Sequence, residues 1–243
     1  MIRYPARDDV LIIVPAYNEA GAVGGVVREI RAVVPGVPVL VIDDCSVDAT
    51  AAVAREAGAH VLSVPYHLGL GGCVQAGYKL AFELGYQYVI RLDGDGQHDP
   101  RFIPDILKTL RESGCQMVIG SRYVKQDGKA TSVVRGIGIR FFRLILRPIL
   151  GARVYDPTSG YVGVNRQALE VFSRSFPLEY PEIEALVVLQ RRAFRFQEVP
   201  CVMRPRQAGR STITPVRSVY YIIHVLLGVL VNILKFERRL WRR

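Results

Sequence analysis

The sequence has few cysteines and no apolar leader segment. The four cysteines of the 243 residues are far apart and form no CxxC pair, which excludes the spacing of a zinc site or of a small disulfide framework; they are Cys45, Cys73, Cys115 and Cys201. This usage is typical of a reduced, cytoplasmic protein in which each thiol is a small packing residue. Residues 1–9 lack the apolar stretch of a secretory signal, so we expect the domain to remain on the side where it is made.

Half of the residues are hydrophobic and 22% are charged, which excludes a disordered chain and a collagen-like repeat. The formal net charge of +10 is unevenly spread: residues 1–120 carry 10 basic and 14 acidic side chains, and residues 121–243 carry 22 and 8. The asymmetry favours a cation or polar ligand at one half and an anion at the other, although solvated surface charge also explains it. No stacking-aromatic motif accompanies the basic half, so we expect no nucleic-acid partner.

The first half of the chain alternates short apolar runs with helix-length segments. The runs, which predict buried strands, are 10–14, 37–42, 60–64, 88–92 and 117–120. The segments between them, which predict helices, are near 20–33, 48–57, 71–84 and 100–112. This alternation predicts an α/β fold with a mostly parallel sheet flanked by helices, in which ligands bind beyond the carboxyl ends of the strands.

Three of the loops that follow these strands are unusually polar. They read PAYNE (Pro15–Glu19), DDCS (Asp43–Ser46) and DGDGQHDP (Asp93–Pro100). Each loop alone also fits a structural role, because Asp and Asn cap helices, as Asp48 or Asp99 would. Together they predict that carboxylates and amides gather at one edge of the sheet.

The sharpest of these elements is the DGDGQ segment. Asp93 and Asp95 lie two residues apart at the end of a buried strand, where their charges repel each other unless a cation lies between them. Hard divalent ions prefer such oxygen ligands, and Mg²⁺ keeps coordination positions for substrate phosphates. An EF-hand is excluded, because Pro104 stands where that loop needs its final glutamate. The segment therefore predicts a divalent metal site, with an ordinary turn as the alternative.

The motifs PAYNE, DDCS, HLGLGGCVQAG (His67–Gly77), DGDGQ and DPTSGY (Asp156–Tyr161) occur in an order that resembles the glycosyltransferase 2 family. The set looks most like the branch of dolichol- or polyprenyl-phosphate sugar synthases, and the resemblance covers residues 10 to 215. It implies the Rossmann-like GT-A fold, Mg²⁺ or Mn²⁺ as cofactor, and a nucleotide diphosphate sugar, UDP- or GDP-linked, as donor.

The resemblance also implies which residues bind the donor. The expected metal ligands are Asp93, Asp95 and Gln97, and the first two loops would cradle the base and ribose. The full expected donor-binding set is Pro15, Tyr17, Glu19, Asp43, Asp44, His67, Gly71, Asp93, Gly94, Asp95, Arg204, Arg210 and Ser211. Many relatives have Asn at the position of His67, so a ligand contact and a supporting role both stay open for it. Gly69, Gly71 and Gly72 are also expected to pack closely at a helix start.

The basic half fits a phosphate acceptor. Arg122 and Arg135 approximately match arginines that this branch uses for the acceptor phosphate, and guanidinium presents paired donors to phosphate oxygens. With Asp95 they are the expected catalytic residues. Residues 204–212, RPRQAGRST, resemble the family's basic loop that closes on the diphosphate or acceptor; a solvated basic loop is the alternative.

Two segments predict contact with a membrane. Residues 136–150 place Arg140, Arg143 and Arg147 on one face of an apolar helix, the pattern of an interfacial helix; a half-buried helix with a salt-bridged stripe is the alternative. The strongly apolar segment 219–234 has 16 residues, which would rise about 24 Å as a helix, less than the roughly 30 Å of hydrocarbon, and the basic tail KFERRLWRR follows it. We therefore divide the chain into a catalytic domain, 1–217, and a membrane-associating helix and tail, 218–243. Packing against the catalytic domain or a second subunit is the alternative.

These features predict an inverting glycosyltransferase that moves a sugar from a nucleotide diphosphate sugar to a polyprenyl monophosphate at the cytoplasmic membrane face. A same-fold enzyme acting on a carbohydrate or protein hydroxyl is an alternative; it would need a general base, for which Glu182 and Glu184 are candidates. A third interpretation is a membrane-bound sugar-nucleotide binding protein without turnover. Self-association, the sugar and the base stay open.

Overall fold

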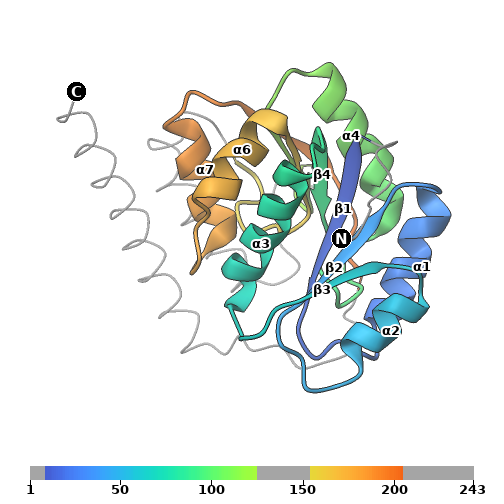
Figure 1. Ribbon diagram of the computed structural model, residues 1–243. Coiled ribbons are helices and arrows are strands. Elements are labelled where there is room, and N and C mark those ends of the chain that lie inside the picture. Colours follow the sequence, from blue (N-terminus) through green and yellow to red (C-terminus); the bar gives the residue numbers. More distant parts are fainter. Residues whose placement is uncertain (1–8, 125–153, 205–243) are drawn as a thin grey trace, which may run out of the picture.

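A computed structural model of the chain describes residues 9–124 and 154–204. Strands and helices alternate through its first part (Figure 1). The elements are β1 (Val10–Ala16), α1 (Val23–Val33), β2 (Val39–Asp43), α2 (Thr50–Glu56), β3 (His60–Ser63), α3 (Gly69–Glu83), β4 (Tyr88–Arg91), the 3-10 turn η1 (Pro100–Phe102), α4 (Ile103–Glu112) and β5 (Met117–Ser121). Each strand and helix expected from the sequence in this part is therefore confirmed, with ends displaced by a few residues.

The second part adds β6 (Val162–Asn165), α6 (Arg166–Arg174), α7 (Pro181–Gln190) and β7 (Phe196–Pro200). All strands join one seven-stranded sheet in the order β3-β2-β1-β4-β6-β5-β7. The sheet is mostly parallel, as predicted, but β6 runs antiparallel to both β4 and β5. No strand is expected at β6 from the sequence pattern. Gly163 lies so close to α4 that a Cβ atom would stand 2.6 Å from an Ile106 methyl carbon, so the packing favours glycine at this position. The glycine interrupts the apolar run of this short strand, and such a run is what would have predicted a strand.

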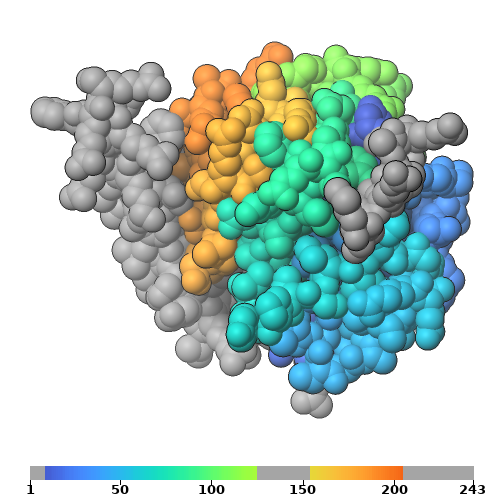
Figure 2. All heavy atoms as spheres, viewed as in Figure 1, coloured from blue at the N-terminus to red at the C-terminus, as the bar shows by residue number. Residues whose placement is uncertain are grey.

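The two faces of the sheet are covered by different helices. Alternate residues of β1 point to opposite sides: Leu11 and Ile13 join the core beneath α3, α6 and α7, whereas Ile12 and Val14 join the core beneath α1 and α4. On the first face α3 and α6 lie side by side (Figure 2), and the ring of Tyr78 stacks on that of Phe172 at 5.6 Å. These two cores fix the sheet edge at which the polar loops emerge.

All four cysteines are free thiols, and all but the half-buried Cys45 are buried. Burial raises the pKa of Cys73 and of Cys201 to about 12, so both are neutral at physiological pH. Cys73, Cys115 and Cys201 are therefore packing residues, as predicted, whereas Cys45 is only half-buried.

No helix within residues 9–124 and 154–204 is long and apolar enough to cross a membrane. The segments 136–150 and 218–243, together with Arg135, Arg206, Arg210 and Ser211, lie outside the described residues. Their expected roles, and the division of the chain at residue 217, stay predictions.

Candidate active site

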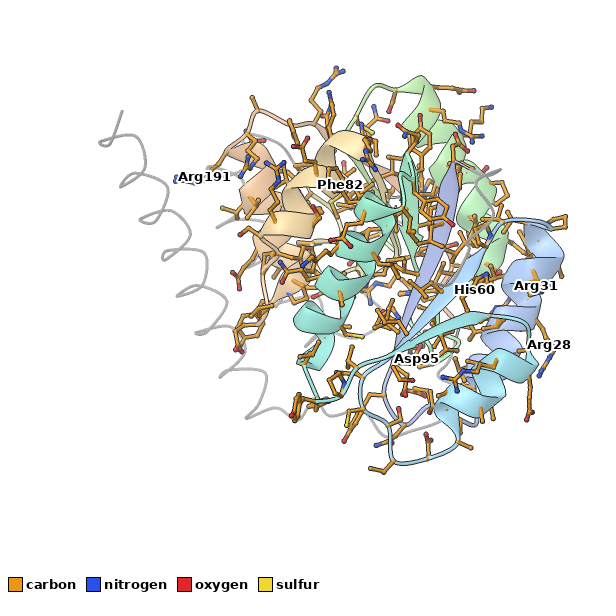
Figure 3. All side chains as sticks on the ribbon, viewed as in Figure 1. Arg28, Arg31, His60, Phe82, Asp95 and Arg191 are labelled. Atoms are coloured by element: carbon orange, nitrogen blue, oxygen red, sulfur yellow. The ribbon has the colours of Figure 1, made fainter. Side chains whose placement is uncertain are left out.

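The DGDGQ loop leaves the carboxyl end of β4 and turns sharply over the end of β1. Gly96 has a φ of +77°, which favours glycine, and Oδ1 of Asp95 accepts a hydrogen bond from the Gln97 amide at 3.0 Å. A Cβ atom on Gly94 would stand 3.2 Å from the Pro15 carbonyl oxygen, so this loop lies directly on the PAYNE loop. Asp95 is 95% buried, near the lower end of the sheet in Figure 3. Two of the three polar loops therefore meet as predicted.

His98 holds Asp93 in place from within the same loop. Its Nδ1 accepts a hydrogen bond from the Asp93 amide at 2.9 Å, and its ring stacks on Tyr161 with centroids 5.0 Å apart. Burial lowers the pKa of His98 and outweighs the negative charge of Asp93, which raises that pKa, so the imidazole is neutral. Because Nδ1 accepts, the proton lies on Nε2, which is 3.8 Å from Oδ2 of Asp93.

A buried arginine lies beside the same carboxylate. The Nη2 atom of Arg91, a side chain 2% exposed at the end of β4, lies 2.7 Å from Oε1 of Glu182 and 3.5 Å from Oδ1 of Asp93. Burial lowers the pKa of Arg91, but the charges of Glu182 and Asp93 outweigh it and raise that pKa above its ordinary value. Arg91 is therefore a permanent cation between two carboxylates. Arg91 is not among the site residues expected from the sequence, although a charge inside the apolar run VIRL is an available signal.

The loops after β1, β2 and β3 converge on Asp44, which is 97% buried. Its Oδ1 accepts a hydrogen bond from the Leu68 amide at 2.7 Å, and its Oδ2 lies 3.0 Å from Nδ1 of His67. The His67 ring in turn lies 4.4 Å from the ring of Tyr17, centroid to centroid. Three of the expected donor-binding residues are thus brought into one contact chain, in which His67 supports Asp44.

The remaining loop contacts are made by backbone atoms. The amide of Asn18, whose φ is +54°, donates to Oγ of Ser46 at 2.9 Å, and the amide of Glu19 donates to Oγ1 of Thr50 at 2.8 Å. Asp43 accepts from the Ser46 amide at 3.3 Å. The first and second loops therefore form one unit, with Glu19 and Asp43 inside it.

Gly71 lies at the start of α3 against the chain that leads into α7. A Cβ atom there would stand 2.4 Å from the Leu178 carbonyl oxygen and 2.5 Å from that of Pro177. Both are backbone atoms, so no side chain fits. Close packing at this glycine is confirmed, whereas its expected contact with the donor stays a prediction.

Arg122 is held by a buried aspartate of the DPTSGY motif. Its Nε and Nη2 donate to the two oxygens of Asp156 at 2.7 and 2.6 Å, and Nη2 also donates to Thr158 at 3.0 Å. Asp156 is fully buried, and its amide donates to Oε1 of Glu198 at 2.7 Å. The pKa of Arg122 is raised above its ordinary value. Burial lowers this pKa, but the hydrogen bonds and charge of Asp156 outweigh burial, and the nearby charge of Asp93 raises it further. Arg122 is therefore a fixed cation, 21% exposed, in the electrostatic neighbourhood of Asp93.

Arg204 joins the site through its backbone. Its amide donates to the Gln97 carbonyl at 2.9 Å, next to a β-bridge between His98 and Met203. Its guanidinium contacts Glu29 at 2.5 Å and Asp99 at 2.9 Å. The side chain expected to bind the donor is thus engaged in ion pairs on the side of α1 and η1.

The side-chain oxygen atoms of the DGDGQ loop suit a hard divalent cation. No group of three His, Cys, Asp or Glu side chains gathers as a metal site in the part of the chain that the structure describes. Asp93, Asp95 and Gln97 carry two carboxylates and an amide oxygen on one loop, and these would be the oxygen ligands of a bound cation. Mg²⁺ is commonly bound by one or two carboxylates with substrate phosphates completing its shell, so these residues fit it.

The family model described as Glycosyl transferase family 2 matches residues 11–172. The chain belongs to this family. It is 30% identical to an undecaprenyl-phosphate mannosyltransferase of Micrococcus luteus, over 83% of this chain and 86% of that protein. It is also 30% identical to a polyprenol monophosphomannose synthase of Mycolicibacterium smegmatis, over 83% and 79% of the two chains.

Among solved structures, the glucosyl-3-phosphoglycerate synthase of Mycobacterium tuberculosis in complex with Mg²⁺ and UDP superposes with a TM-score of 0.70. That synthase is 26% identical to the present chain, and the match covers 92% of this chain and 80% of that one. The expected family and fold class are both confirmed.

Proposed function

We propose that the protein transfers a glycosyl unit, with inversion, from a nucleotide diphosphate sugar to a polyprenyl monophosphate. The observation that carries this proposal is the match, along 83% of the chain, to two relatives named as polyprenyl-phosphate mannosyl enzymes. The charged loops at one sheet edge support it, because they offer separate places for a metal-bound diphosphate and for a second phosphate.

On the donor side, Asp93, Asp95 and Gln97 would hold Mg²⁺ or Mn²⁺. When bound, the cation supplies charge neutralisation for the departing diphosphate. The unit of Tyr17, Asp44 and His67 would hold the nucleoside, while Pro15 and Gly94 provide a tightly packed loop floor. Arg204, Arg210 and Ser211 stay proposed contacts of the basic loop.

On the acceptor side, Arg122 is a fixed cation, and Arg135 is proposed to assist it. A phosphate monoester has a second pKa of about 6 and is largely ionised at neutral pH, so it attacks the sugar without a protein base. Positioning and electrostatics then supply most of the acceleration. Glu182, a candidate base for a hydroxyl acceptor, is engaged by Arg91 at 2.7 Å, which favours the phosphate acceptor.

The lipid tail of such an acceptor lies in a bilayer, so the proposal includes membrane association. The sequence patterns of residues 136–150 and 218–243 support peripheral or monotopic attachment. We place the enzyme at the cytoplasmic face, where nucleotide sugars are made.

The test is transfer of radiolabelled sugar from UDP- and GDP-linked donors to polyprenyl phosphate in detergent with Mn²⁺. We expect label in an organic-extractable, mild-acid-labile product. Label found only in a water-soluble carbohydrate or a protein would favour the hydroxyl-acceptor alternative. Donor binding without any transfer would favour the non-catalytic one.

A further inference from the structure

Two carboxylates compete for the same nitrogen of Arg91. Nη2 lies 2.7 Å from Oε1 of Glu182, a hydrogen bond, and 3.5 Å from Oδ1 of Asp93, an ion-pair contact. Among the described residues, Glu182 is the hydrogen-bond partner of the Arg91 side chain, and the buried Nε atom of Arg91 has no partner among these residues. The Arg91 guanidinium therefore contacts Glu182 of α7 more closely than it contacts Asp93 of the DGDGQ loop.

The surroundings leave this guanidinium little freedom. A Cβ atom on Gly160 would stand 2.8 Å from Nη2 of Arg91 and 3.0 Å from Oδ2 of Asp93, so the backbone at Gly160 closes one side. Burial raises the pKa of the neighbouring Tyr78 to about 12, so that phenol adds no charge. The nearby carboxylates, Glu182 and Asp93, hence decide where the positive charge lies.

We propose that Glu182 is a positioning residue that sets the divalent-cation affinity of the DGDGQ loop by holding the Arg91 guanidinium away from Asp93. When Glu182 is charged, Nη2 of Arg91 stays hydrogen-bonded to Glu182 on α7, and the negative charge of Asp93 stays available to the metal. Without that charge, Asp93 becomes the strongest partner of Arg91 and the guanidinium competes with the cation for the same oxygen. This inference rests on the part of the proposed function that places a divalent cation on Asp93 and Asp95.

The test is a titration of the full-length protein with Mn²⁺, in which electron paramagnetic resonance reports the free ion. The titration is done alone and with UDP or GDP, with protein-free nucleotide controls. Glu182→Gln keeps the shape of the side chain and removes its charge, whereas Glu182→Asp keeps the charge and shortens the chain. The matched control is Glu179→Gln, the same change at an exposed position just before α7.

We expect Glu182→Gln to weaken Mn²⁺ binding about tenfold, and Glu182→Asp and the control to stay within about threefold of wild type. A packing role predicts the reverse order, because Gln fills the site of Glu better than Asp does. The double variant Arg91→Gln/Glu182→Gln removes the competing cation, so its Mn²⁺ affinity should return to the wild-type value or exceed it. It also leaves no uncompensated buried arginine, so it should fold even if the single variant does not, and a double variant that binds Mn²⁺ more weakly than wild type then overturns the inference.

Unchanged affinity in Glu182→Gln, or a double variant as weak as the single one, overturns the inference while the metal site stands. A wild-type protein that binds no Mn²⁺ in any of these titrations overturns both this inference and the metal part of the proposed function. The transfer assay then reports separately on the reaction itself.

Discussion

At the scale of single residues, the site is built from buried charges that fix one another. Arg91 pairs with Glu182 across 91 positions of the sequence, and Arg122 pairs with Asp156 across 34. The sequence revealed Asp93 and Asp95 because they lie two residues apart in the chain and follow an apolar run. It did not reveal their partners, because such pairs are made by the sheet order and not by local spacing.

Asp95, as a proposed metal ligand, is the residue whose substitution should reduce activity most. Asp95→Asn should lower turnover by at least about a hundredfold, because a neutral amide no longer balances the cation that stabilises the leaving diphosphate. The fold should persist, since the Asn oxygen can accept the Gln97 amide as Oδ1 does now. Transfer rates and thermal unfolding of the variant measure the two effects. The control is Asp105→Asn, on the exposed face of α4; comparable losses in both variants would contradict a specific role.

The neutral state of His98 predicts a pH dependence of stability. Its pKa in the folded protein is lowered by burial below the ordinary 6.5, so the unfolded chain binds more protons as the pH falls through 6.5. The free energy of unfolding should therefore fall between pH 7 and pH 5, and His98→Asn should flatten that slope. Urea unfolding in metal-free buffer measures it, with His60→Asn as the comparison. Parallel slopes in wild type and His98→Asn would show that other groups cause the dependence.

At the scale of elements, the part with regular alternation was predictable and the part without it was not. Strands β1 to β5 each follow a helix-length segment or precede one, so hydrophobic period alone located them. Strand β6 is four residues long and antiparallel, and β7 is half-exposed with the charged Glu198 at its centre. These two strands take their positions from pairing with β4 and β5 and from contacts such as the Glu198 bonds to Tyr155 and Asp156.

The join between α3 and the entry to α7 gives a test at this scale. Gly71→Ala should lower the free energy of unfolding by about 1–3 kcal/mol or more, because its Cβ would meet backbone atoms of Pro177 and Leu178 that cannot rotate away. Gly25→Ala, in α1 with nothing within 4 Å of the added carbon, should instead raise it by roughly 0.5–1 kcal/mol. Urea midpoints of the two variants measure the difference. Equal effects would mean that α3 can shift away from the α7 entry.

At the scale of the whole molecule, charge separates along the chain. Residues 121–243 carry 22 basic and 8 acidic side chains, whereas the sheet edge with the DGDGQ loop comes from the more acidic residues 1–120. A bilayer with anionic headgroups would attract the basic half and leave the acidic loops to bind their cation. The sequence predicts this division by simple counting, although it does not predict how the two halves are oriented on a surface.

The tail KFERRLWRR offers the most direct test of that division. Replacing Arg238, Arg239, Arg242 and Arg243 with Gln in the full-length protein removes four cations, each worth about 1 kcal/mol near an anionic bilayer. Binding to vesicles with anionic lipid should therefore weaken by about three orders of magnitude, while binding to purely zwitterionic vesicles should change little. Vesicle flotation at low and high salt measures both, and salt should reduce the wild-type binding toward that of the variant. If the variant floats with anionic vesicles as the wild type does, attachment comes from apolar contacts, and the charge asymmetry serves the acceptor phosphate instead.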